Sequence, residues 1–250
     1  MKRFRVISCV AILFLGAACG GDSTPTQEGQ ATHTTIVLGY SIKPFSDLKG
    51  AKLAGTDLSA TFLVGADLTG ADLTGANLSN ADSFFTALSG ATFTNADLTN
   101  ANLSFSEAIE TNFGGAKLVG ANLIGASLRF SQLKMADLTN ANLTRADLYA
   151  VYLTNAVLIG ANLTSSNLGN SELVSANLVG AYLINADLSL ADARQANMQN
   201  ADLTNANLRG ADLTGANLTG ANLTNADLTG ANITNADLTG ADLTRAKIPK

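Results

Sequence analysis

The chain has 250 residues, of which 15 are Lys or Arg and 20 are Asp or Glu, so its formal net charge is −5 at pH 7. This acidic balance argues against direct binding of nucleic acid, because proteins hold the phosphate backbone mainly through Lys and Arg. With 2 cysteines and 1 histidine, the composition excludes a disulfide framework and predicts neither a metal centre nor a cofactor.

Residues 1–18 have the order of a bacterial secretory signal. Three basic residues precede an apolar run over 6–15, which is too short to span a membrane, and small residues follow it. Cys19 resembles the acylated cysteine of lipoprotein signals, although Gly16 stands where those signals prefer Leu. The sequence therefore predicts export and a lipid anchor on Cys19 at the cell envelope, facing the periplasm or the surface; cleavage after Ala18 without a lipid is the alternative.

Residues 19–33 are rich in Gly, Ser, Thr, Pro and Gln, and we expect a flexible tether there. The only histidine, His33, lies at its end and is expected to be a surface residue. Residues 34–47 form a lead-in, whose apolar stretch 34–40 predicts a strand that covers the N-terminal end of the following segment. Removal of the signal takes away 3 basic residues and leaves 12 against 20 acids, a net charge of −8.

From Leu48 to Ile248 the sequence repeats every five residues without insertion. We call the first residue of this series position i; it is Leu in 33 of 41 repeats, with Ala usual at i−2 and Asp or Asn at i−1. A period of five fits neither an amphipathic helix nor a half-buried strand. It predicts a short extended piece with i−2 and i facing inward, followed by a corner at which Gly or Asn at i+2 suits a positive φ.

The pentads, for example Ala-Asp-Leu-Thr-Gly at 211–215, resemble the pentapeptide-repeat family over about four fifths of the chain. The resemblance implies an all-β fold, a right-handed quadrilateral β-helix over 48–250 with four pentads per coil and about ten coils. Ser83, Ala108 and Ala193 replace the usual Leu at i. We expect a thin core or slight bulges at these three positions.

Acidic residues follow the repeat, since 17 of the 20 occupy position i−1. Some members of the family are thought to bind DNA gyrase by imitating DNA, so the resemblance implies a DNA-mimicking regulator of a type II topoisomerase as an alternative function. Residues twenty apart should stack, however, and most acids would then lie on amides, as stability alone favours. The expected acid-on-acid pairs, which leave a cation-binding surface as a second alternative, are Asp47 over Asp67, Glu172 over Asp192, and Asp192 over Asp212.

Large apolar residues at outward positions are the main departure from the polar pattern. They are expected to form two groups on neighbouring corners: Phe84, Phe85, Phe105 and Ile124 in the first, and Ile109, Phe130 and Tyr149 in the second. Contiguous exposed aromatic residues are typical of a protein contact. The alternative is that these side chains fill bulges near Ser83 and Ala108.

The sequence indicates no catalytic residue and no phosphate-binding loop, because the glycines occupy repeat corners. We therefore expect a non-enzymatic binding or scaffold rod with an unidentified protein partner, held at the membrane through Cys19. The repeat runs to Ile248 without residues for a capping helix, which also predicts end-to-end self-association.

Overall fold

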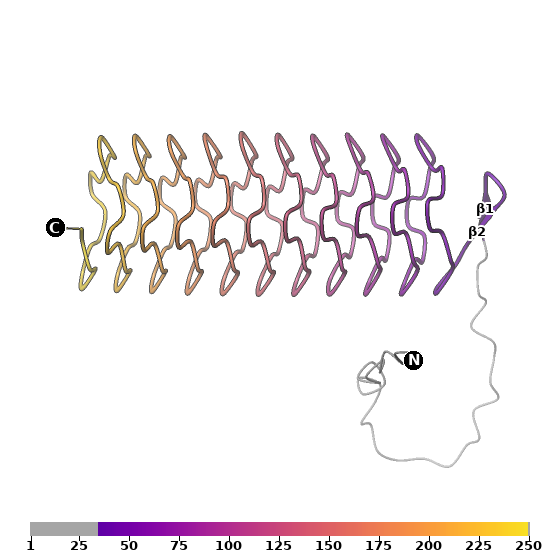
Figure 1. The fold of residues 1–250 in the computed structure, drawn as a ribbon, viewed down its shortest axis with the longest axis horizontal. Coiled ribbons are helices and arrows are strands. Elements are labelled where there is room, and N and C mark those ends of the chain that lie inside the picture. The colour runs from indigo at the N-terminus through magenta and orange to yellow at the C-terminus, as the bar shows by residue number, and fades with distance from the viewer. Residues whose placement is uncertain (1–34, 250) are drawn as a thin grey trace, which may run out of the picture. The chain divides into compact units, whose positions relative to one another are not determined.

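The computed structural model describes residues 35–249, so the signal, Cys19 and His33 lie outside the described residues. Figure 1 shows the described chain as a stack of similar coils. The fold is a right-handed quadrilateral β-helix, in which parallel bridges join neighbouring coils. Within 35–249 no helix is long and apolar enough to cross a membrane.

Hydrogen bonding between coils follows a constant register. Parallel bridges join each residue at i−1 to the residue twenty positions later, beginning with Asp47 and Asp67. The N–H of Leu213 donates to the carbonyl of Asn232 in the next coil at 2.8 Å, and the N–H of Ala216 closes the corner on the carbonyl of Leu213 at 2.9 Å. Twenty residues are four pentads, which confirms the prediction of four sides per coil.

The interior is lined by the residues at i and i−2, as the period predicts. Leu213 and Ala211 are buried, whereas Thr214 and Gly215 of the same pentad are not. The side chains at i−2 and i point inward because successive residues of an extended segment face opposite sides.

The register between coils continues through the three positions that have a short residue instead of Leu. Ser83, Ala108 and Ala193 are buried, and their N–H groups donate to the next coil at 2.8 Å. The usual corner bond is also made at Ala193, whereas the carbonyls of Ser83 and Ala108 accept from the hydroxyls of Thr86 and Ser131 instead. The expected irregularity is therefore confined to the corners after Ser83 and Ala108.

Larger residues elsewhere in the same coils replace the missing volume. Phe93 follows Ser83 by half a coil, Phe113 follows Ala108 by one side, and all four are buried. The Phe93 and Phe113 rings stack with centroids 5.0 Å apart and an interplanar angle of 14°. Because a large side chain opposes Ser83 and another adjoins Ala108, the interior stays filled and the register between coils is kept.

Two short strands precede the first coil. β1 (Thr35–Val37) pairs antiparallel with β2 (Tyr40–Ile42). The segment predicted as one strand over 34–40 thus turns back at Leu38 (φ 47°) and Gly39 (φ 83°), a two-residue turn that needs positive φ at both positions. Ile42 is buried against the interior of the coils, so β2 covers part of their N-terminal end.

Candidate functional site

The outermost corner of each repeat imposes one backbone conformation. From Gly50 to Arg245 every residue at i+2 has a positive φ, as the frequent Gly and Asn at this position predict. Phe85 and Phe105 share this conformation, with φ of 56° and 57°. A residue with a Cβ loses about 1–2 kcal/mol in the left-handed region, and only Gly and Asn adopt it readily. Phenylalanine is therefore an unfavourable choice at these corners for the backbone alone.

We call Phe84, Phe85, Phe105 and Ile124 the aromatic corner, and the structure places these residues in successive coils. The Phe84 ring lies 6.3 Å from that of Phe85 and 5.9 Å from that of Phe105, the second pair edge to face. The N–H of Phe105 donates to the carbonyl of Ile124 at 2.9 Å. Phe85 is 59% exposed and Phe105 53% exposed, so both rings lie largely in solvent.

One more ring belongs to this corner and was not found from the sequence. Phe45 is 77% exposed and packs on Gly65, in the space that a Cβ of that glycine would occupy. Gly65 in turn precedes Phe85 by twenty residues, so Phe45, Gly65 and Phe85 occupy the same corner in successive coils. Extending the repeat frame back by one pentad, past Pro44, would have revealed Phe45.

In the second predicted group, the side chain of Arg129 contacts both aromatic rings. The rings of Phe130 and Tyr149 meet edge to face with centroids 6.1 Å apart, and Ile109 precedes them at the same corner. The guanidinium of Arg129 lies 5.6 Å and 5.0 Å from the two ring centroids and pairs with Asp147 at 3.2 Å. Arg129 therefore covers part of this group, which presents less free apolar surface than the aromatic corner.

The exposed rings do not fill the core. Phe93 and Phe113 carry out that function and are buried, whereas Phe85 and Phe105 lie outside the coils whose short residues are Ser83 and Ala108. The geometry therefore argues against the alternative in which the aromatic corner is packing material.

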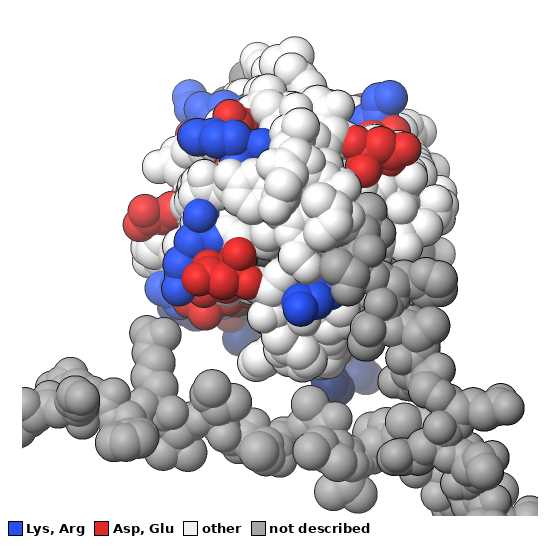
Figure 2. Space-filling model, turned by 90° about the vertical axis from the view of Figure 1, so that its right-hand side faces the viewer, with Lys and Arg blue, Asp and Glu red and all other residues white. Residues whose placement is uncertain are grey.

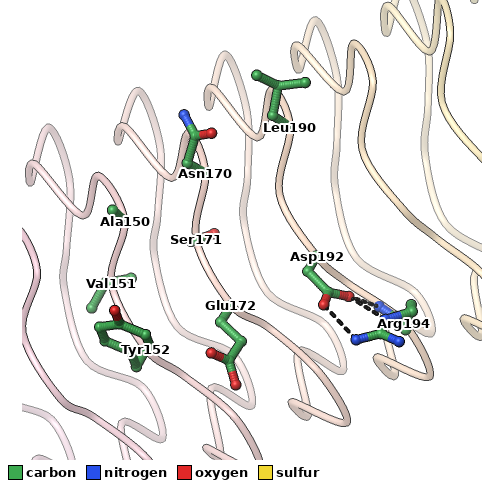
Figure 3. A pocket seen from close by; sticks show the side chains of 9 residues that line it. All are labelled: Ala150, Val151, Tyr152, Asn170, Ser171, Glu172, Leu190, Asp192 and Arg194. Carbon is green, nitrogen blue, oxygen red and sulfur yellow. Dashed lines mark hydrogen bonds and ion pairs between the residues drawn. The ribbon is translucent and has the colours of Figure 1, made fainter.

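A surface hollow of about 440 Å³ lies along three neighbouring coils and includes the predicted acidic pair Glu172 and Asp192 (Figure 3). Arg194 binds the carboxylate of Asp192 through two hydrogen bonds of 2.8 Å and 2.7 Å, which lower the pKa of Asp192. Lys134 lies 3.8 Å from the carboxylate of Glu172. Both acids are thus neutralised by side chains of the protein itself.

The acids at i−1 mainly support the backbone. The N–H of Thr99 donates to Asp97 at 3.0 Å, and this bond and that from the Thr99 hydroxyl lower the pKa of Asp97. Amides join neighbouring coils, as where the Asn77 side chain donates to Asp57 at 3.1 Å. Figure 2 shows basic side chains beside acidic ones at one end of the coil stack rather than a continuous acidic strip. Within residues 35–249, no group of three or more His, Cys, Asp or Glu could hold a metal ion.

Comparison with known proteins agrees with this architecture. A family model described as pentapeptide repeats matches most of the coil region, at residues 46–82, 85–113, 109–145, 141–178, 171–210 and 206–245. The chain belongs to the pentapeptide-repeat family. The family consists generally of structural or binding proteins rather than enzymes.

Two solved pentapeptide-repeat structures are similar to this chain. HetL from the cyanobacterium Nostoc sp. strain PCC 7120, described as involved in the regulation of heterocyst differentiation, is 31% identical over 81% of this chain and 89% of HetL, with a TM-score of 0.57. Trypsin-treated QnrB1, a plasmid-mediated fluoroquinolone resistance protein, is 23% identical over 79% of this chain and 89% of QnrB1, with a TM-score of 0.60, and supports the fold alone. No curated protein sequence matches the chain.

Proposed function

We propose that this pentapeptide-repeat protein is a non-enzymatic binding rod, that its protein partner contacts the aromatic corner, and that a lipid on Cys19 holds it at the bacterial cell envelope. The observation that carries the proposal is the exposure of Phe85 and Phe105 at corners where φ is positive. The positive φ disfavours these rings and they lie outside the core, although one edge of the Phe105 ring packs on Gly125 of the next coil. Binding accounts for the surface that stays exposed, since aromatic side chains commonly anchor protein interfaces.

The two alternative functions receive less support from the described side chains. A DNA mimic needs an extended acidic surface, whereas Lys49 pairs with Asp67 at 3.0 Å, and Lys117, stacked on Asp97, lies 4.0 Å from its carboxylate. A cation-binding surface needs free carboxylates, and Glu172 and Asp192 already have Lys134 and Arg194 beside them.

The double substitution Phe85→Asn and Phe105→Asn tests the aromatic corner. Asparagine is the residue that many other repeats place at i+2, so the variant should fold and its thermal midpoint should stay the same or rise. Capture of a specific partner from solubilised envelope should weaken by at least about thirty-fold, since anchors of this kind contribute about 2 kcal/mol or more.

Phe130→Asn is the matched control, because it removes an exposed ring at the same repeat position in the second group. It should leave capture unchanged. A double variant that loses stability but keeps its partner would show that the rings serve packing and would exclude the proposed contact.

The lipid anchor is tested separately by Cys19→Ser. Without the thiol no acyl chain can be attached, and we expect the protein to leave the membrane fraction during washing of the envelope with salt. Incorporation of a fatty-acid analogue should label the wild type and not the variant. An unlabelled wild-type protein would rule out the anchor, while leaving the test of the aromatic corner unaffected.

A further inference from the structure

Acidic side chains lie on both sides of the aromatic corner. Asp82 precedes Phe84 by two residues, and Glu107 follows Phe105 by two residues on the adjoining side of the coil. Asp82 accepts hydrogen bonds from the Phe84 N–H at 3.2 Å and from the Asn102 side chain at 2.9 Å, both at the same oxygen. Asp82 is half-buried and Glu107 is exposed.

No cation of the protein neutralises these two acids within residues 35–249. Neither Asp82 nor Glu107 has a Lys or Arg within 4.0 Å, in contrast to Asp67, Asp147 and Asp192 elsewhere on the coils. Among the pentads stacked on this corner in the other coils, the nearest basic residues are Lys43 and Arg145. Each is two coils from Phe85 or Phe105, about 10 Å at the usual spacing of neighbouring strands.

We infer that the aromatic corner binds a protein segment whose apolar side chains are flanked by Lys or Arg. This inference rests on the proposed function, because it defines the partner of the same surface. Apolar side chains of the segment would pack on Phe85 and Phe105, and its basic residues would pair with Asp82 and Glu107. Charges at the rim of an interface select the partner more than they strengthen binding, so the acids set specificity and the rings supply affinity.

Charge disfavours the two other apolar partners. A second copy of this chain docked through the same corner would bring its own Asp82 and Glu107 toward these acids, and like charges in contact oppose association. A membrane surface presents anionic lipids, which the flanking carboxylates would repel. A basic segment is the partner that satisfies both the rings and the carboxylates.

Synthetic peptides that share one apolar core and differ only in their flanks test the inference. The peptides carry two Lys, two Ser or two Glu on each side, and their binding to the full chain is measured by fluorescence anisotropy. We expect the Lys-flanked peptide to bind about fivefold more tightly than the Ser-flanked one, as two exposed ion pairs would give, and the difference to vanish at high salt.

Variants assign the effect to particular side chains. Asp82→Asn with Glu107→Gln should abolish the preference for Lys flanks, whereas Asp187→Asn with Asp202→Asn, which removes the same charge from other coils, should preserve it. Phe85→Asn with Phe105→Asn should weaken all three peptides. Equal binding of the three peptides, or no binding of any, overturns the inference, as does vesicle sedimentation that depends on Phe85 and Phe105. Such results leave capture of an envelope partner as an independent test of the proposed function.

Discussion

Replacement of Leu213 by Asp is expected to lower the free energy of unfolding by more than about 4 kcal/mol. Leu213 is buried in the interior, and the same inward position is occupied by Ala193 in the preceding coil and Ile233 in the following one. A carboxylate at this place would be buried without a cation or a hydrogen-bond donor, among the most destabilising changes a single residue can make. Thermal or chemical unfolding followed by circular dichroism measures the loss.

Thr214→Asp is the matched control, since it adds the same charge one residue later on the outer surface. The Thr214 hydroxyl accepts a hydrogen bond from the side chain of Asn232 at 2.9 Å and donates one to the carboxylate of Asp212; a carboxylate at 214 keeps the first bond but repels Asp212. The expected loss is at most about 1 kcal/mol, the scale for like charges side by side on an exposed surface. Similar losses for the two variants would be inconsistent with the inward and outward positions described above.

The fold could be predicted from the sequence because each pentad repeats the same pattern of inward, outward and corner residues. Inward residues are mostly Leu and Ala, corners are mostly Gly or Asn, and 41 copies in one register leave a single architecture that satisfies them all. The alternation of acid with amide is likewise explained by direct contact, as between Asn207 and Asp187 at 2.8 Å. Where the pattern was regular, the prediction was correct in detail.

Prediction failed where a residue departs from the pattern and another compensates. Phe93 and Ser83 lie ten positions apart, so a reading of single pentads treats them as unrelated, although they occupy the same coil. The turn in the lead-in was missed because Leu38, an apolar residue with φ of 47°, hides the only local signal, Gly39. Whether an outward ring is free or covered also depends on neighbouring coils, as Arg129 shows for Tyr149 in the next coil.

Phe93→Ala should be the other strongly destabilising variant, with an expected loss of about 3–5 kcal/mol. The ring is buried and stacks on Phe113, and the opposite wall of its coil carries only Ser83. Only the side of the cavity that faces Ser83 lacks a large side chain to collapse into it, while the Phe113 ring would lose the face on which it now stacks. Chemical denaturation gives the difference in unfolding free energy.

A double-mutant cycle separates compensation from simple loss of volume. Phe93→Leu should destabilise by leaving space, and Ser83→Leu alone should destabilise by about 1–3 kcal/mol through overpacking against the Phe93 ring. Combined, the two substitutions rebuild a coil with Leu at every inward i position, so they should be less harmful together than their sum by at least about 1 kcal/mol. Strict additivity would mean that Ser83 and Phe93 do not share volume, and the unbroken register at Ser83 would then need another cause. Coupling of the expected sign would show that the chain balances the volume of its core coil by coil.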